Sequence, residues 1–146
     1  MRTGIALTVG ILLGSLLVPS SSQGRAAAAP VAASKCPWPP ELDAVTAAPK
    51  NHRVLLENDR VRVLDVTVAP GEREAVHAHC LPSVMYVMYE GIDRNYDAQG
   101  RLIGEQKVAP PLSEFPQVFW LESTPPHAIE NLDRQPIHLV RIELKQ

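Results

Sequence analysis

The sequence predicts an all-β fold, either an antiparallel sandwich or a barrel. Short runs rich in valine, isoleucine and aromatic residues follow one another, and turn residues separate them at intervals of about 8–12 residues. No segment keeps the 3.6-residue period of an amphipathic helix over several turns. The chain has 14 prolines among 146 residues, which favours loops and strand ends over helices. These patterns indicate packed antiparallel sheets without an internal repeat.

Nine segments are predicted as strands, because each combines β-forming residues with a turn signal at one end. The segment 60–68 (RVRVLDVTV) is rich in valines that alternate with other residues, and the segment 83–89 (SVMYVMY) is the most apolar. The alternation predicts that Arg60 and Arg62 lie on a solvated face. A short helix is predicted at 42–48. In chain order, the predicted strands are 53–57, 60–68, 75–79, 83–89, 94–98, 101–108, 118–121, 127–131 and 137–144.

Residues 1–28 have the layout of a secretory signal peptide. Arg2 precedes an uncharged apolar run at 4–18, and small residues follow it. We expect cleavage somewhere between residues 28 and 33, and therefore a secreted or periplasmic protein. The alternative is an uncleaved membrane anchor, but the apolar run of about 15 residues is shorter than the roughly 20 that span a bilayer. We therefore predict no stable membrane insertion of the mature chain.

The mature chain is predicted to have a proline-rich arm, residues 29–51, and one globular domain, residues 52–146. Loss of residues 1–28 removes two of the 14 basic residues, Arg2 and Arg25, and none of the 16 acidic ones. The formal net charge therefore changes from −2 to about −4. A mildly acidic domain without a basic run argues against nucleic acid as a partner.

The two cysteines, Cys36 and Cys80, would both remain after cleavage. Disulfides persist in oxidising compartments, so these residues form a candidate disulfide. Closing a loop of this length would stabilise the fold by about 4 kcal/mol in the chain-entropy model. Two unpaired thiols are the alternative, and the sequence does not separate the two.

The segment from Gly71 to His79 (GEREAVHAH) contains the candidate metal ligands. Side chains at i and i+2 of a strand project from the same face, so His77 and His79 would point at one place. A third histidine, His127, lies in a similar strand-like context. The two remaining histidines, His52 and His138, are interpreted as surface or packing residues.

This arrangement resembles the cupin superfamily over roughly residues 52–144. Gly71, His77, His79 and Gly91 follow the spacing of the first cupin motif, Gly-x5-His-x-His-x3–4-Glu-x6-Gly. The segment 127–131 (HAIEN) resembles the second half of the second motif, Pro-x-Gly-x2-His-x3-Asn. The resemblance implies a double-stranded β-helix, or jelly roll, in which two sheets enclose a pocket. Because small cupins commonly dimerise, it also implies a homodimer.

The sequence departs from these motifs at several positions. Val84, or Ser83 at the shorter spacing, stands where the first motif has glutamate. Glu122 and Thr124 stand at the proline and glycine positions of the second motif. Glu72 and Glu74 are predicted to have the wrong strand parity to supply the missing carboxylate.

The resemblance therefore implies a three-histidine site without a carboxylate. His77, His79 and His127 would hold a divalent transition metal, one of Fe, Mn, Ni, Cu or Zn. The residues predicted to line the pocket beside it are Val84, Tyr86, Met88 and Trp120.

Three functions are compatible with the sequence. The first is a small metal-dependent enzyme acting on a small molecule, with dioxygenase, isomerase or lyase chemistry. The second is a non-enzymatic cupin, structural or binding a small molecule, with weak or no metal. The third is an interaction module whose N-terminal arm docks on a partner or a sister subunit. No motif identifies a substrate, and the fold alone does not decide among these functions.

Overall fold

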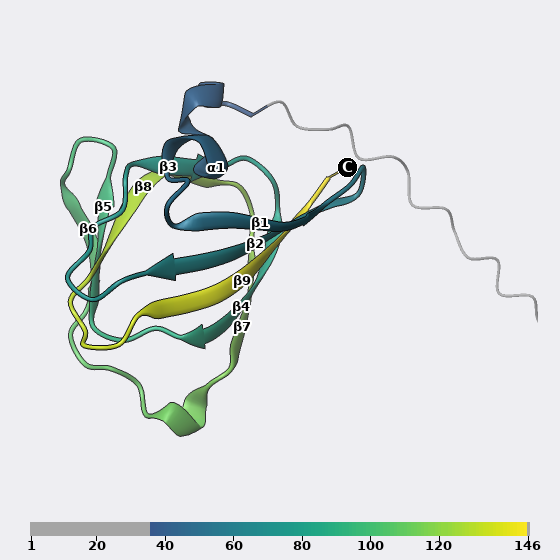
Figure 1. Cartoon of the computed structure of the whole chain (residues 1–146). Helices are drawn as coiled ribbons and strands as arrows, with labels where there is room; N and C mark the ends of the chain where they lie inside the picture. Colours follow the sequence, from purple (N-terminus) through teal and green to yellow (C-terminus); the bar gives the residue numbers. More distant parts are fainter. Residues whose placement is uncertain (1–35, 146) are drawn as a thin grey trace, which may run out of the picture.

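The computed structural model describes residues 36–145 of the chain, and the predicted signal peptide lies outside the described residues. This part of the chain folds into the predicted all-β architecture, with short helical turns before the first strand and before β7 (Figure 1). The helical segments are η1 (Pro40–Leu42), α1 (Ala44–Ala47) and η2 (Leu112–Glu114). The strands are β1 (His52–Glu57), β2 (Val61–Val68), β3 (His77–His79), β4 (Ser83–Tyr89), β5 (Asp93–Asp97), β6 (Leu102–Gln106), β7 (Gln117–Leu121), β8 (Thr124–Asn131) and β9 (Ile137–Leu144).

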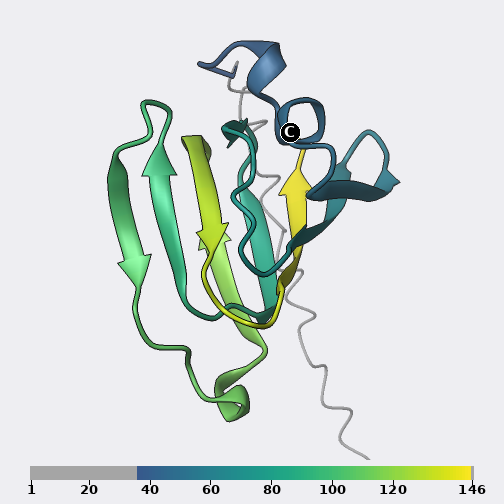
Figure 2. The ribbon, with the colours of Figure 1, turned by 60° about the vertical axis from the view of Figure 1, so that its left-hand side comes forward.

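The strands form two antiparallel sheets. One sheet has the order β1-β2-β9-β4-β7, and the other has the order β3-β8-β5-β6. Figure 2 shows the second sheet beside the first, with β5, β6 and β8 on one side and β9 on the other. The chain passes repeatedly from one sheet to the other, so residues distant in sequence meet between them.

The inward faces of β2 and β9 form much of the core. In the antiparallel register, Val66 pairs with Leu139 and Val68 pairs with Ile137. Side chains alternate across a strand, so one set of each strand points between the sheets. The core cluster consists of Leu64, Val66, Val68, Val87, Ile137 and Leu139.

The same alternation places Arg62 on the inward side, which contradicts its predicted position on a solvated face. Leu64 is fully buried, and Arg62 is two residues before it on the same strand. The Arg62 side chain is only 13% exposed and forms ion pairs with Asp43 and Glu143. The valines at positions 61 and 63 suggested the opposite phase, but they are only partly buried.

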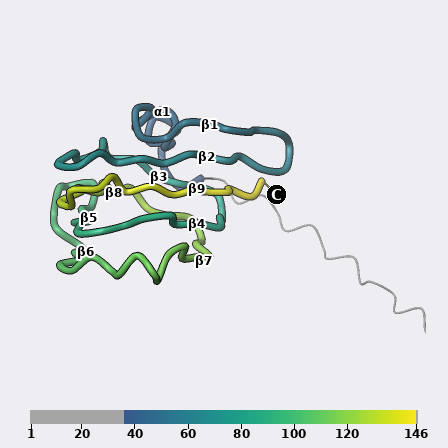
Figure 3. The backbone as a smooth tube through the Cα atoms, turned by 60° about the horizontal axis from the view of Figure 1, so that its bottom comes forward, coloured from purple at the N-terminus to yellow at the C-terminus, as the bar shows by residue number. Residues whose placement is uncertain are grey.

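The segment before β1 packs against the domain. The Asp43 side chain caps α1 by accepting a hydrogen bond from the backbone N–H of Val45 (3.1 Å). Ala44 and Ala48 are buried, and α1 lies against β1 (Figure 3). A disulfide joins Cys36 to Cys80 across a Cα–Cα distance of 5.0 Å. The structure therefore attaches Cys36 of the predicted arm to the residue that directly follows β3, the strand with His77 and His79.

The path from Gly71 to β3 is irregular. Gly71 has a φ of 74°, a left-handed turn conformation that glycine adopts without steric cost. Residues 72–76 follow without a regular strand, and β3 is shorter than predicted because it includes only residues 77–79. Conversely, β8 begins at Thr124, so the prolines at 125 and 126 are inside the strand. Among the described residues, no helix is long and apolar enough to cross a membrane.

Candidate metal centre

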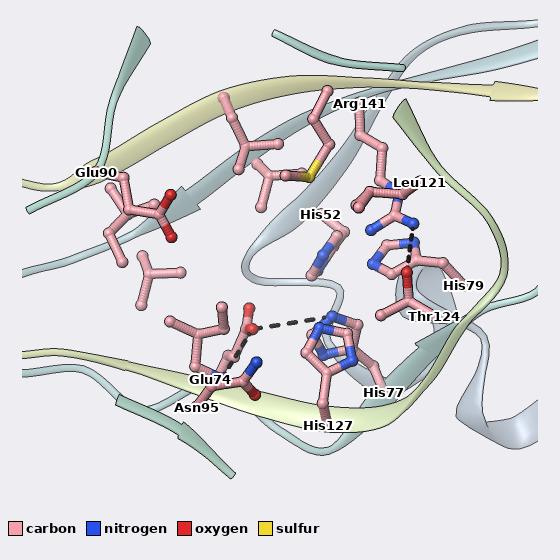
Figure 4. Close-up of a pocket in the computed structure, with 16 residues that line it drawn as sticks. His52, Glu74, His77, His79, Glu90, Asn95, Leu121, Thr124, His127 and Arg141 are labelled. Atoms are coloured by element: carbon pink, nitrogen blue, oxygen red, sulfur yellow. Dashed lines mark hydrogen bonds and ion pairs between the residues drawn. The ribbon is translucent and has the colours of Figure 1, made fainter. Parts of the chain in front are cut away.

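A cavity of about 290 Å³ lies between the two sheets (Figure 4). Much of its wall is aliphatic, and its polar residues include four histidines. Such a combination, with an apolar wall and a few placed polar groups, is typical of small-molecule sites. The aliphatic wall residues are Val66, Val68, Met85, Leu121, Ile129, Ile137 and Leu139.

Four buried imidazoles gather at this cavity. His77 and His79 come from β3, and His127 is the register partner of His77 on β8. His52, the first residue of β1, is the fourth. The centroid of the His77 ring lies 4.4 Å from that of His52, 5.0 Å from that of His79 and 4.5 Å from that of His127. None of the four residues is more than 8% exposed.

Each of these imidazoles uses Nδ1 in a hydrogen bond to an acceptor. His77 donates to the carbonyl oxygen of Ala75 (2.9 Å), which lies two residues earlier. The other three bonds join His127 to the Pro125 carbonyl (2.8 Å), His52 to the Ala48 carbonyl (3.2 Å), and His79 to the Glu143 carboxylate (2.7 Å). Carbonyl and carboxylate oxygens only accept, so Nδ1 carries the proton in each ring and Nε2 carries the lone pair. This is the tautomer in which a partner at Nδ1 orients Nε2 for a metal.

Burial keeps these imidazoles neutral. Desolvation lowers the pKa of His52 to about 4 and that of His77 to about 2. Burial also lowers the pKa of His79 and of His127, and the positive charge of Arg141 acts in the same direction. Because only the neutral imidazole binds a metal ion, the cluster is in its ligating form at neutral pH.

Glu74 supplies a carboxyl group to the same cluster. Its Oε1 lies 3.8 Å from His77 Nε2 and accepts a hydrogen bond from the Ile129 N–H (3.1 Å). Its Oε2 is buried and has no hydrogen-bond partner among the described residues. The prediction that parity excludes Glu74 is therefore wrong, because residues 72–76 do not form a regular strand.

The geometry gives two sets of ligand atoms that lie within 4.8 Å of one another. One set is His52, His77 and His79, and the other is Glu74, His77 and His127. His77 belongs to both sets. Three imidazoles with an open position, or imidazoles with one carboxylate, are donor sets that divalent transition ions use in proteins. With the free Nε2 atoms and the unpartnered Glu74 oxygen, these residues fit such an ion.

Behind His79, a series of charged groups leads to the segment before β1. The Glu143 carboxylate accepts from His79 Nδ1 through Oε1 and from Arg62 Nε through Oε2 (2.6 Å). Arg62 donates two further hydrogen bonds to the Asp43 carboxylate (3.0 and 2.7 Å). Burial disfavours the Arg62 charge, but these hydrogen bonds outweigh it and raise the pKa of Arg62. The orientation of His79 is thus connected to the residue that caps α1.

The structure brings together the three histidines that the sequence singled out, and it adds His52. The interpretation of His52 as a surface or packing residue is wrong, because its ring faces His77 in the cavity. It precedes the first predicted strand, outside the cupin motifs, so no motif indicated its role. His138 lies outside the cavity and pairs with Asp65 near the surface (2.9 Å).

The four predicted pocket residues do not line the cavity, which contradicts that prediction. Tyr86 and Trp120 are 42% and 55% exposed on the outer side of their sheet. Val84 pairs with Trp120 on β7, and Met88 likewise lies outside the cavity wall. Met85 and Leu121, their sequence neighbours of opposite parity, line the cavity instead. The segment 83–89 is apolar on both faces, so its sequence does not fix which face is inward.

Neither protein-family models nor curated protein sequences give a match to this chain. Among solved structures, a cupin domain from Bordetella pertussis matches with a TM-score of 0.51 and 20% identity, covering 65% of this chain and 92% of that one. This likeness shows that the chain has the cupin fold, a double-stranded β-helix, as the sequence motifs predicted.

Two other solved structures are also similar. One is an uncharacterized conserved protein with a double-stranded β-helix domain from Klebsiella pneumoniae (TM-score 0.46, 18% identity, 64% of this chain and 75% of that one). The other is an RmlC-like cupin family protein from Methanocaldococcus jannaschii (TM-score 0.46, 10% identity, 64% of this chain and 78% of that one).

Proposed function

We propose that this protein is a secreted or periplasmic small cupin that binds a divalent transition metal and a small molecule in its barrel. The observation that carries the proposal is the tautomer pattern. Within residues 36–145, four buried imidazoles use Nδ1 as a donor and make no hydrogen bond through Nε2, at one end of an otherwise largely aliphatic cavity. An ordinary packing cluster of histidines has no reason to leave every Nε2 lone pair without a hydrogen-bond donor.

In this proposal, His77 is the central ligand, and His52 and His79 complete the set. His127 and Glu74 stand on the other side of His77 and would supply further ligands. The ion would supply Lewis acidity at an open coordination position. The chain's own contribution is orientation and exclusion of water. Glu143 fixes the His79 ring, and the aliphatic wall keeps the cavity dry.

Metal binding is tested by elemental analysis and by zinc titration calorimetry on the purified mature chain. We expect about one zinc per chain, and a loss of affinity of at least about 100-fold in His52→Ala and in His79→Ala. His138→Ala is the matched control, because this histidine is outside the cavity. Equal zinc affinity in the wild type and in His52→Ala would contradict the proposed ligand set. An absence of zinc binding in the folded wild type would contradict the metal proposal and favour the non-enzymatic alternative.

The proposed location has independent support. The Cys36–Cys80 disulfide is of a kind that persists in oxidising compartments, as the predicted signal peptide requires. The homodimer stays a prediction from the cupin resemblance. The exposed apolar side chains of Tyr86, Val118 and Trp120 give it a candidate interface. Fractionation of the expressing cell and light scattering of the purified protein test these two points.

A further inference from the structure

Arg141 on β9 is a buried cation in the wall of the cavity. The residue is 3% exposed, and its guanidinium lies beside His79 and Thr124 (Figure 4). A guanidinium has five N–H donors. Among the described residues, the structure gives it one hydrogen bond, from Nη2 to Thr124 Oγ1 (2.8 Å). Its Nε is buried and has no hydrogen-bond partner in this part of the chain.

A comparison with Arg62 shows what Arg141 lacks. Arg62 makes three hydrogen bonds to carboxylates, two to Asp43 and one to Glu143. Arg141 Nε lies 4.0 Å from Glu143 Oε1, beyond hydrogen-bond distance, and that oxygen already accepts from His79. Burial accordingly lowers the pKa of Arg141 to about 10. A buried guanidinium without a bonded carboxylate is energetically costly unless a ligand supplies the anion.

The rest of the cavity defines what such a ligand would carry besides the anion. Seven of its sixteen wall residues have branched aliphatic or methionine side chains, so the body of the ligand is apolar. Glu90 lines the cavity on the side opposite to Arg141 in Figure 4. Arg141 is the only arginine or lysine among the described wall residues, so the cavity orients an apolar anion with its charge toward Arg141.

We propose that the cavity binds a small apolar carboxylic acid, with its carboxylate on the Arg141 guanidinium and its body against the aliphatic wall. This inference specifies the chemical class of the small molecule in the proposed function. It rests on the proposed function only for the role of that ligand beside a metal. The guanidinium fork matches a carboxylate in geometry as well as in charge, which a neutral isostere does not reproduce. The anchoring does not require the metal, so the two ideas can be tested separately.

The test uses a matched pair of probes, 4-methylpentanoate and its neutral amide, 4-methylpentanamide. Each is titrated into the metal-free full mature chain at constant ionic strength, because a metal could itself bind a carboxylate. We expect the wild type to bind the acid at least about 10-fold more tightly than the amide. Arg141→Met should remove this preference, and Arg53→Met should keep it. Arg53 is the control because its side chain is 72% exposed and outside the cavity.

A second measurement does not depend on the folding of a variant. The ¹H–¹⁵N signal of Arg141 Nε in the wild type should shift on addition of the acid and remain unchanged with the amide. Equal affinity for acid and amide in the wild type, an unshifted Nε signal, or a preference that survives in folded Arg141→Met would overturn the inference. Zinc titration separates it from the metal proposal. Zinc binding without a preference for the acid contradicts this inference alone, and a preference without zinc binding contradicts the metal proposal alone.

Discussion

The inward faces of β2 and β9 have two halves with different chemistry. Toward one end, the facing residues are aliphatic and form the core. Toward the other end, the same alternation continues with charged residues that adjoin the histidine cluster. The aliphatic half consists of Leu64, Val66, Val68, Ile137 and Leu139, and the charged half of Arg62, Arg141 and Glu143.

The two halves should respond differently to mutation. The aliphatic half is stabilised by removal of apolar surface from water, which does not depend on a specific partner. In the charged half, Arg62 and Glu143 are stable only because they are hydrogen-bonded to each other and to Asp43 and His79, so these groups are interdependent. The barrel therefore uses one continuous face both to hold the sheets together and to build the site.

The largest expected effect comes from Glu143→Ala. Glu143 is fully buried and accepts from Arg62 and His79, so its loss leaves a buried guanidinium without one of its carboxylates. We expect a loss of about 3–5 kcal/mol in the free energy of unfolding, measured in urea. Glu105→Ala, which removes an acid from a surface ion pair, should change it by less than about 0.5 kcal/mol. Similar values for the two variants would show that the charged half is not interdependent.

The next effect is expected from Leu64→Ala in the aliphatic half. Leu64 has no exposed surface, so the substitution leaves a cavity in the core. We expect a loss of about 2–4 kcal/mol in the free energy of unfolding, with zinc affinity of the folded protein little changed. Leu55→Ala is the control, because Leu55 is 48% exposed. A large loss of zinc affinity in Leu64→Ala would mean that the two halves are not separable.

A smaller effect should appear in the pH dependence of the metal-free protein. Burial lowers the pKa of His52 to about 4, whereas the unfolded chain has its ordinary value of 6.5. Between these values the unfolded state binds a proton that the folded state does not. This contribution to stability is therefore complete above pH 6.5 and is lost as the pH falls toward 4. The loss for His52 is about 3 kcal/mol.

The comparison must be made as a difference between the wild type and His52→Gln. Burial raises the pKa of Glu74 to about 8 and that of Glu90 to about 7. The contribution of these two groups to the free energy of unfolding therefore falls as the pH rises, which is opposite to the effect of His52. Urea unfolding at pH 7.5, 6 and 5 should show a smaller decrease in the free energy of unfolding toward low pH in His52→Gln than in the wild type. Parallel curves for the two proteins would contradict a buried neutral His52.

Much of the fold was predictable from the sequence. The sequence predicted about eight or nine strands and nine are present in residues 36–145, with the final strand correct at both ends. The His-x-His spacing and His127 indicated three members of the cluster, because strand parity is a local property.

The remaining site residues depend on contacts between distant parts of the chain. His52 reaches the cluster only through the register of β1 against β2, where it pairs with Val66. Glu143 is buried because Arg62, 81 residues away in sequence, neutralises it. The inward face of β4 could not be assigned, because its sequence is apolar on both sides. Pairing and register decide these positions, and a single sequence contains neither.

The central claim is that the four clustered imidazoles are neutral, protonated at Nδ1 and ready to bind a metal through Nε2. Long-range ¹H–¹⁵N correlation spectra of the metal-free protein at pH 7 test it most directly, because they distinguish the two tautomers and the cation of each histidine. We predict Nδ1–H tautomers for His52, His77, His79 and His127, and a change confined to the Nε2 signals of the ligands when zinc is added. Nε2–H tautomers or imidazolium cations in the cluster, or spectra that zinc leaves unchanged, would contradict the account.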